Sequence, residues 1–352
     1  MMGNEILLSV LEDFGLKNIS SIEKFGNGLI NYSWKINTDS NSFFLQKLNT
    51  EVFPNPEDIA TNLQLIGDYL SSKQPDYLFV HPIRTSKGRN FVKTGDKDIF
   101  RIFPFINDSH SIDVAETADQ AYEAARQFGM FTKKLADFPA ERLTSTLPEF
   151  HNLIHRYSQF RQALRGATKD RLRSANELVQ RIYEHVDIIS TYEKNQSATA
   201  LPTRVMHHDT KINNVLFNTN EKGICVVDMD TVMPGYFISD FGDMMRTYLS
   251  PSSEDDEDFE KIGIRNEFFQ GIAEGYLEQM SSVLNNNEKE MLIYSGFFMT
   301  YMQGVRFLTD YLNNDAYYKT SYEGHNLVRA ENQMTLLRRL VGKKNELKRL
   351  VG

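Results

Sequence analysis

Three polar residues in the segment MHHDTKINNVLF have the types and the spacing that suit transfer of a phosphoryl group. His207, Asp209 and Asn214 fit the pattern H-x-D-x-x-x-x-N of a phosphoryl-transfer catalytic loop. In such a loop the aspartate accepts or orients the acceptor hydroxyl, while the asparagine reaches a magnesium ion on the nucleotide. We therefore assign Asp209 the catalytic role. His207 is expected to support the loop backbone.

A second carboxylate follows this loop closely. The short apolar runs VLF and ICVV are joined by NTNEKG, which is rich in turn-forming residues, so the order predicts an antiparallel hairpin. Asn214 precedes the first strand and Asp228 follows the second, which would place them side by side at the open end of the hairpin. Magnesium prefers a few hard oxygen ligands together with phosphates. We therefore predict that Asn214 and Asp228 bind Mg²⁺ beside Asp209.

The phrase Asp-Phe-Gly occurs further on, at residues 240–242, and protein kinases use the same phrase for their metal-binding carboxylate. Here, however, Asp240 lies one loop beyond the hairpin and has no strand to hold it near Asn214. Ser239 or Asp240 instead precedes an expected helix, FGDMMRTYL, as a helix N-cap would. The sequence thus predicts a structural Asp240, and a metal-binding Asp228 in the phrase VVDMD.

The adjacent histidines 207 and 208 next to Asp209 admit a different interpretation, a hydrolytic metal centre. Adjacent side chains on a loop point apart, however, and no second His or Asp group in the chain has ligand spacing. Phosphoryl transfer is therefore the preferred interpretation of this segment.

The elements around these residues predict an α+β, two-lobed fold like that of protein kinases. Strand-like runs dominate the first hundred residues, interrupted by one helix that begins at Asn55 and Pro56. From about residue 106 helices dominate, apart from the hairpin described above. We expect a small antiparallel-sheet lobe over residues 1–103, which binds the nucleotide, and a larger helical lobe over residues 104–352, which carries catalysis and the acceptor site. A cleft between two lobes is a favoured ligand site.

Composition narrows the classes of protein to consider. The net charge of -8 argues against a nucleic-acid binder, because phosphate contacts need a basic surface. The single cysteine, Cys225, lies in an apolar run and is expected to be a buried thiol. The first residues resemble a helix and not a signal peptide, and no apolar stretch has membrane-spanning length. We expect a cytoplasmic protein without nucleic-acid or membrane partners.

The segments HHDTKINNVLF, VVDMDTVMPG and SDFGDMMRT resemble the aminoglycoside phosphotransferase and choline kinase superfamily. FGNGLINYSW, LADFPAERL and RFLTDYLNNDAYY are similar to its N-acetylhexosamine 1-kinase group, so the resemblance covers nearly the whole chain. It implies that ATP is the co-substrate and Mg²⁺ the metal ion. It also implies a phosphate loop at Gly26, Asn27 and Gly28, adenine contacts at Phe103 and Phe105, and acceptor contacts at Arg306, Tyr317 and Asp230.

The chain departs from this family at two places. Leu29 stands where the sugar 1-kinase branch has a histidine close to the acceptor, so the identity of the sugar stays open. The lysine that contacts phosphates in kinases is also ambiguous. Gln46 lies in the apparent register and Lys47 one residue later, and a shift of one residue moves a strand side chain to the other face. We choose Lys47, with Glu57 as its helix partner.

The sequence therefore predicts an ATP- and Mg²⁺-dependent kinase that phosphorylates a sugar, at the anomeric 1-hydroxyl of an N-acetylhexosamine or related hexose. An amino-alcohol kinase of the choline or homoserine type, or an aminoglycoside kinase, is the alternative. A catalytically silent, kinase-like binding module is a third possibility. Arg306 would repel a cationic acceptor, unless it forms an ordinary surface pair with Asp310 on the same helix face.

Overall fold

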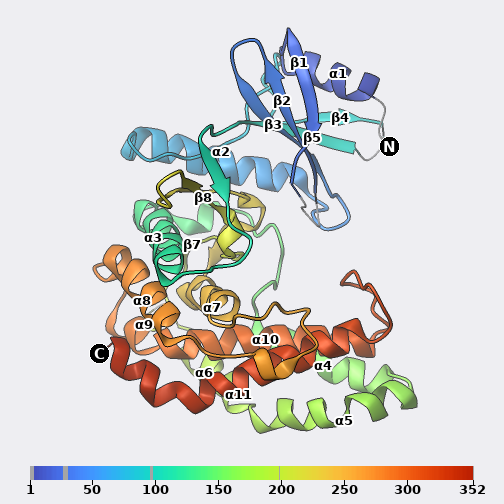
Figure 1. Ribbon diagram of the computed structural model, residues 1–352, viewed down its shortest axis with the longest axis vertical. Helices are drawn as coiled ribbons and strands as arrows, with labels where there is room; N and C mark the ends of the chain where they lie inside the picture. Colours follow the sequence, from blue (N-terminus) through green and yellow to red (C-terminus); the bar gives the residue numbers. More distant parts are fainter. Residues whose placement is uncertain (1–3, 27–30, 96–97, 198, 352) are drawn as a thin grey trace.

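The computed structural model describes residues 4–26, 31–95, 98–197 and 199–351 of the chain. It has a small lobe built on an antiparallel sheet and a larger, mostly helical lobe (Figure 1). The predicted α+β, two-lobed fold is confirmed.

The small lobe consists of one five-stranded sheet and two helices. Across the sheet the strands follow the order β1-β2-β3-β5-β4, and every neighbouring pair is antiparallel. Their bounds are β1 Ile19–Lys24, β2 Tyr32–Thr38, β3 Ser42–Leu48, β4 Val92–Thr94 and β5 Asp98–Pro104, with helices α1 Asn4–Asp13 and α2 Pro56–Lys73. The turn between β2 and β3 is closed by the Thr38 N–H, which donates to the Asn41 carbonyl over 2.9 Å.

The two faces of this sheet have different neighbours, because successive strand residues point to opposite sides. Leu45 and Phe100 point to one side, where they join a buried cluster with Leu7 and Leu11 of α1. Leu48 belongs instead to the main core, together with α2 and the helices of the large lobe. The second face is therefore the one turned toward the rest of the molecule.

Helix α2 links the lobes. Pro56 is its first residue and Asn55 precedes it without a side-chain cap, while Ile59, Leu63, Ile66 and Leu70 are buried in the main core. The side chain of Asn62 donates to the carbonyls of Thr144 and Val232, over 2.8 and 3.2 Å, and accepts from the Thr144 N–H. These hydrogen bonds tie α2 to the large lobe.

The chain passes from one lobe to the other just after β5. Strand β6, Ser109–Ser111, already pairs with β8 of the large lobe. The main core does not divide at this connection, because α2 and Ile99 pack into the same buried cluster as the large-lobe helices.

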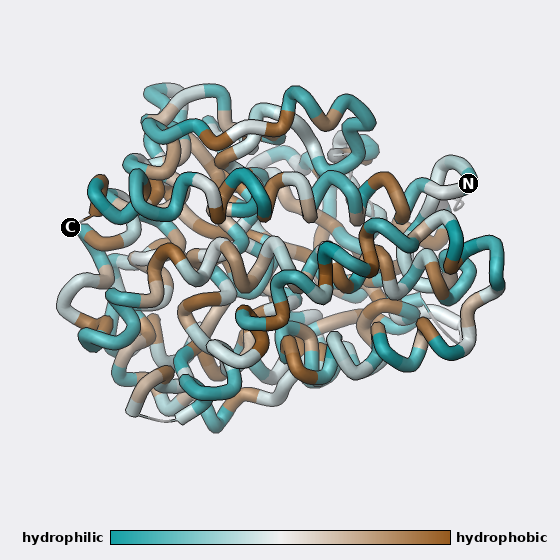
Figure 2. Tube along the Cα trace, turned by 90° about the horizontal axis from the view of Figure 1, so that it is seen from below, coloured by the Kyte–Doolittle hydropathy of each residue, from teal (hydrophilic) through white to brown (hydrophobic). Residues whose placement is uncertain are grey.

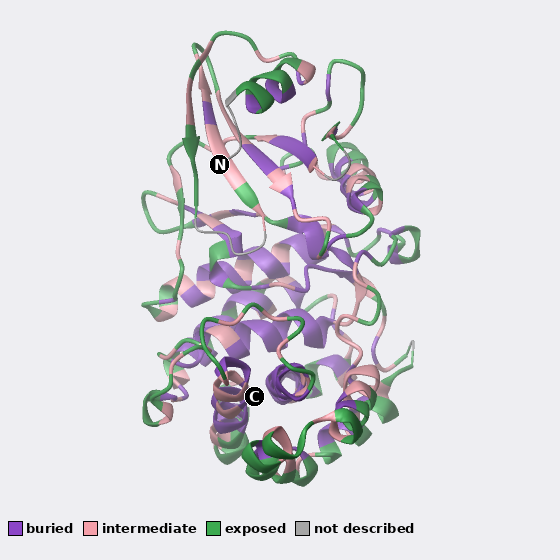
Figure 3. Cartoon of the chain, turned by 90° about the vertical axis from the view of Figure 1, so that its right-hand side faces the viewer, coloured by how far each residue is buried: buried purple, intermediate pink, exposed green. Residues whose placement is uncertain are grey.

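The large lobe surrounds a buried helix, α10. Of its 21 residues only a few reach the surface, because its sequence is apolar on all sides. Figure 3 shows the buried residues concentrated in the middle of the molecule, with exposed residues on the outer helices. The remaining elements are α3 Ala118–Lys134, α4 Leu153–Gly166, α5 Lys169–Glu184, α6 Asp187–Asn195, β7 Arg204–Met206, β8 Val215–Asn218, β9 Gly223–Val226, β10 Met233–Gly235, α7 Phe237–Tyr248, α8 Asn266–Met280, α9 Asn286–Glu290, α10 Leu292–Leu312 and α11 His325–Val351.

Hydrophilic and hydrophobic residues alternate along the helices on the underside of the molecule (Figure 2). None of the helices in the described ranges combines the length and the apolar character needed to cross a bilayer.

Candidate functional site

The predicted catalytic loop follows β7 and leads into β8. The Asn214 side chain donates through Nδ2 to the Asp209 carbonyl over 2.9 Å, which ties the end of the loop to its centre. Strands β8 and β9 form the predicted antiparallel hairpin, with Val215 opposite Val226. Its open end is closed by the Val227 N–H, which donates to the Asn214 carbonyl over 2.8 Å. Asn214 and Asp228 thus lie at the adjacent ends of the two hairpin strands, as the sequence predicted.

Asp228 lies where several carboxylates meet. Its backbone adopts the left-handed conformation, with φ 58° and ψ 61°, which turns the chain sharply after β9. Burial and, after it, the negative charges of Asp230 and Asp209 raise the pKa of Asp228 to about 7, although Arg101 and Lys211 act in the opposite direction. A divalent cation at this place would relieve that repulsion.

The donor set fits magnesium. The hydrogen bond to the Asp209 carbonyl uses the amide nitrogen of Asn214, so the amide oxygen Oδ1 is not used by this bond and could bind a cation. In the described part of the chain no three His, Cys, Asp or Glu side chains are gathered as a complete metal site. An ion held by Asn214 and Asp228 would therefore complete its coordination with phosphates and water, as magnesium does in many kinases.

The predicted helix cap at Asp240 is wrong. Helix α7 begins at Phe237 after Tyr236, so Asp240 lies inside its first turn and is fully buried. The carboxylate of Asp240 accepts the backbone N–H groups of His207 and His208, over 2.9 and 2.8 Å. Its role is structural, but it acts on the catalytic loop and not on the helix end.

The two histidines of the loop point apart, which excludes a shared metal site for their rings. The His207 ring packs against Phe128 and Phe131, and its Nε2 lies 3.0 Å from the Val227 carbonyl, so Nε2 carries the proton. Burial lowers the pKa of His207. His208 turns toward His151, with 5.3 Å between the ring centroids. His207 therefore supports the loop backbone, as predicted.

A series of ionic contacts, buried at Asp243 and Arg246 and partly exposed at Glu254, continues from the loop to the acidic stretch after α7. The Thr210 N–H donates to Asp243, and the Arg246 guanidinium contacts Asp243 over 3.0 Å and Glu254 over 2.7 Å. Burial would raise the pKa of Glu254, but Arg246 and Lys211 outweigh it and hold this pKa at about 2.

The small lobe meets the site at Asp230. Its carboxylate lies 2.5 Å from Nη1 of Arg101 on β5 and accepts a hydrogen bond from the Asn31 side chain over 3.2 Å. Both Asp230 and Arg101 are buried. Asp230, predicted as an acceptor contact, is thus engaged with the small lobe.

The structure separates the two candidates for the phosphate-binding position on β3. Lys47 points to the α1 side of the sheet and forms an ion pair with Asp98 over 2.7 Å. Gln46 points to the opposite side and accepts hydrogen bonds from Nε and Nη2 of Arg101, over 2.9 and 2.5 Å. Lys47 is therefore not among the residues gathered near Asp230. Glu57 lies at the start of α2 with an unrelated group of residues around Thr50 and Lys93.

The predicted adenine contacts belong to an aromatic cluster on the inner face of the sheet. Phe44 packs against Phe103 with 6.3 Å between ring centroids, and Phe25 lies 5.4 Å from Phe105. Gly26, predicted in the phosphate loop, has φ +75°, a conformation that favours glycine. Asn27, Gly28 and Leu29 lie outside the described residues.

The predicted acceptor contacts lie on the large lobe. The Arg306 guanidinium packs over the rings of Phe150 and Tyr318 and donates to the Gln303 side chain over 3.0 Å. The surface pair with Asp310 does not form. Asp310 is buried and instead accepts the backbone N–H groups of Tyr317 and Tyr318, both over 2.8 Å.

Tyr317 is 66% exposed beside Tyr318.

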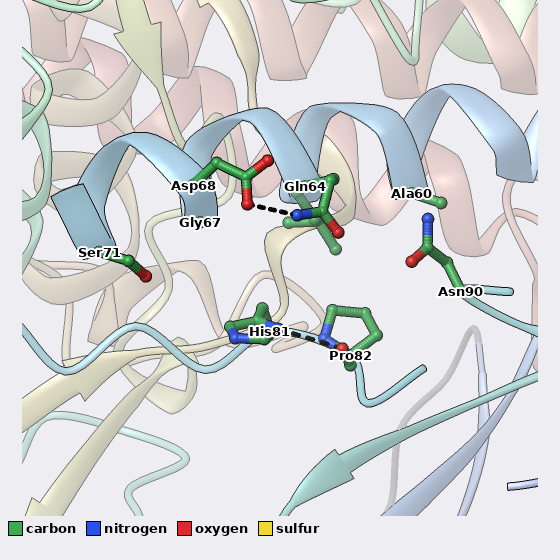
Figure 4. A pocket seen from close by; sticks show the side chains of 9 residues that line it. Ala60, Gln64, Gly67, Asp68, Ser71, His81, Pro82 and Asn90 are labelled. Carbon is green, nitrogen blue, oxygen red and sulfur yellow. Dashed lines mark hydrogen bonds between the residues drawn. The ribbon is translucent and has the colours of Figure 1, made fainter. Parts of the chain in front are cut away.

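A shallow pocket beside α2 is lined by Gln64, Asp68 and His81 and shares no residue with this site (Figure 4). The polar residues that sequence reasoning missed are Asn31, Arg101, Asp243 and Glu254, and Gln46 was considered there but not chosen. Most of them come from segments far from the motif, and the sequence carries no spacing signal for them.

The fold and the family follow from comparison with known proteins. The chain is similar to a microcompartment-associated aminopropanol kinase (14% identity, TM-score 0.64, 98% of each chain covered). It is also similar to a spectinomycin phosphotransferase solved with ADP and spectinomycin (14% identity, TM-score 0.61, 97% of this chain and 99% of that chain covered). A third similar structure is the choline kinase of Cryptosporidium parvum Iowa II (15% identity, TM-score 0.58, 99% and 97% covered).

These likenesses show the fold, and the sequence profile of the phosphotransferase enzyme family matches residues 21–278. The predicted superfamily is confirmed, while its N-acetylhexosamine 1-kinase branch stays a prediction. The chain belongs to the phosphotransferase enzyme family.

Proposed function

We propose that the chain transfers the γ-phosphate of ATP, with Mg²⁺, to the anomeric hydroxyl of an N-acetylhexosamine or a related hexose. Asp209 orients the acceptor hydroxyl and accepts its proton. Asn214 and Asp228 hold the metal ion, which neutralises charge on the phosphates. In reactions of this class positioning and charge neutralisation supply most of the rate enhancement.

The choice of acceptor rests on one observation, the positive charge beside the catalytic loop. Arg306 donates to Gln303, and Arg156 donates to the Phe150 carbonyl and to Gln159, so their partners are neutral. In the described ranges no carboxylate forms an ion pair with either arginine. Burial and, after it, the charge of Arg306 lower the pKa of Arg156 to about 10, and both arginine side chains contact Phe150.

This charge lies within reach of the catalytic loop. Arg306 and Arg156 both lower the pKa of the partly buried His151, and the ring of His151 lies against that of His208, next to Asp209. A cationic amino alcohol or aminoglycoside would be repelled there. A neutral sugar would be bound favourably there, because guanidinium groups donate hydrogen bonds to hydroxyl and ring oxygens, and aromatic faces pack against sugar rings.

An acceptor screen tests this proposal. Purified protein is incubated with ATP and Mg²⁺ and with hexoses, N-acetylhexosamines, amino alcohols or aminoglycosides, and ADP formation is measured. We expect turnover with an N-acetylhexosamine or hexose, accompanied by loss of the reducing end of the sugar. The matching 1-deoxy sugar, which lacks the anomeric hydroxyl, should be inactive. Turnover with choline, homoserine or an aminoglycoside alone would contradict the proposed acceptor, although not the kinase chemistry.

A further inference from the structure

The small lobe has to supply positive charge to the site. The charges of Asp209 and Asp230 both act on the Asp228 carboxylate, Asp230 is in contact with Arg101, and the nucleotide phosphates add more negative charge. Two cations act on this group, Lys211 from the catalytic loop and Arg101 from β5. Arg101 is the one that comes from the small lobe.

The register of the sheet places Arg101 along the inner face. Gln46 of β3 is opposite Arg101 of β5, and two residues earlier on β3 Phe44 is opposite Phe103. Residues two apart share a face, so the aromatic pair and the polar pair form neighbouring rows, about 7 Å apart along the strand. A base lying on the aromatic row would direct its phosphates toward the polar row and Asp230.

Arg101 is held in a fixed orientation there. Its Nε and Nη2 both donate to Oε1 of Gln46, and its Nη1 lies against Asp230. The side chain of Arg101 is only 7% exposed. These contacts use three of the five N–H donors of a guanidinium, whose planar fork suits phosphate oxygens. Gln46 is neutral, so it orients Arg101 without cancelling its charge.

We propose that Arg101, positioned by Gln46, is the small-lobe residue that binds the phosphates of the nucleotide. It does so in place of a lysine on β3, because Lys47 points to the α1 side and is paired with Asp98. The inference rests on the proposed use of ATP, and its test separates the two. The competing interpretation is that Arg101 only joins the lobes through its ion pair with Asp230.

The test compares the binding of a nucleotide with that of its nucleoside. Calorimetry gives the affinities of wild type, Arg101→Met, Arg101→Lys and Lys47→Met for Mg·ATP, ADP and adenosine, and the series is repeated with the guanine compounds. A hydrogen-bonded charge contact corresponds to about a 10–100-fold loss of affinity. We expect that loss for ATP and ADP in Arg101→Met, a smaller one in Arg101→Lys, and none for the nucleoside. Lys47→Met should bind all three ligands as the wild type does.

Other results overturn the assignment. Equal losses for nucleoside and nucleotide in Arg101→Met mean that Arg101 only supports the lobe, and a loss confined to Lys47→Met transfers the role to Lys47. Asp230→Asn provides an independent check that leaves Arg101 in place. A phosphate-binding Arg101 predicts that this variant binds ATP at least as tightly as wild type, whereas a simple link between lobes predicts the same loss as in Arg101→Met. If wild-type protein binds neither ATP nor GTP, the proposed function itself fails.

Discussion

Two regions of the molecule provide the charges of the site, and they are built differently. The carboxylates of the catalytic region lie within residues 209–230, and the chain brings them together through one loop and one short hairpin. On the sheet face of the small lobe, Gln46 and Arg101 are 55 positions apart and meet only because β3 and β5 pair in one register. The first arrangement is local in sequence, and the second depends on the tertiary fold.

The difference shows which residue neighbours can be predicted from the sequence without knowing the exact strand register. A hairpin joins its two strand ends whatever the detailed register, so Asn214 and Asp228 are neighbours in any reasonable pairing. On β3 a shift of one residue exchanges the two faces of the strand. The comparison also predicts separate effects. Changes in the catalytic region should alter turnover and acceptor use, and changes on the sheet face should alter nucleotide affinity.

The largest expected effect tests the catalytic region directly. Asp209→Asn keeps the shape of the side chain but removes its charge and basicity. We expect turnover to fall by about 10²–10⁴-fold, the range for a positioned general base, with little change in ATP affinity. Steady-state kinetics and calorimetry measure the two quantities. Near-normal turnover would remove Asp209 from the mechanism, and a loss of ATP affinity alone would break the proposed separation between the regions.

The next prediction concerns the support beneath the loop. Asp240→Ala leaves the N–H groups of His207 and His208 without their acceptor, and each unsatisfied buried donor costs about 1–3 kcal/mol of unfolding free energy. The loop carrying Asp209 should also shift, and a misplacement of about 1 Å lowers turnover on the order of 10²-fold. Urea unfolding and kinetics at a temperature where the variant is folded measure both effects.

Asp119→Ala is the matched control, since Asp119 also lies in the first turn of a helix, α3, but is exposed. It should change stability only slightly and turnover not at all. If Asp240→Ala behaves like this control, the loop does not depend on Asp240. Asp228→Ala provides the contrast, because it should abolish Mg²⁺-dependent activity while the fold stays intact.

Much of the fold could be predicted because the patterns were local. Pro56 at the start of α2 and the VLF–ICVV hairpin each follow from a few neighbouring residues, and the structure contains both. The motif spacing around Asp209 was sufficient for the same reason. Its loop and hairpin need no distant partner to form.

The remaining contacts could not be predicted, because they depend on distant partners. The carboxylate of Asp240 reaches residues 33 and 32 positions earlier, and the helix start at Phe237 removes it from the cap position. Arg306 and Asp310 have the spacing of an ion pair, but Asp310 turns to the backbone of residues 317 and 318. The pattern of apolar and polar residues in the sequence does not indicate which distant groups a polar side chain will contact.

The variant Arg306→Ala tests whether the acceptor binds to the large lobe. Arg306→Ala removes a guanidinium held against Phe150 and Tyr318, and a charged hydrogen bond to a sugar corresponds to about a 10–100-fold increase in acceptor KM. The KM for ATP should not change. The exposed Arg165 of α4 provides the control variant Arg165→Ala, with neither constant altered. An unchanged acceptor KM in Arg306→Ala would remove Arg306 from the site.

The smallest expected effect concerns Glu254, which is connected to the catalytic loop through Arg246 and Asp243. Because its pKa of about 2 lies below the ordinary value of 4.5, its charged form stabilises the folded state at neutral pH, and this contribution disappears as the pH falls from about 4.5 toward 2. Glu254→Gln should therefore cost about 1–2 kcal/mol of unfolding free energy at pH 7, a value reduced because 31% of the side chain is exposed. Urea unfolding at pH 7, 5, 4 and 3 should show the difference from wild type shrinking only below pH 4.5. Glu260→Gln, whose side chain is 95% exposed, should match wild type throughout. A Glu254→Gln difference that stays constant down to pH 3 would mean that the carboxylate charge is not what links this segment to the loop.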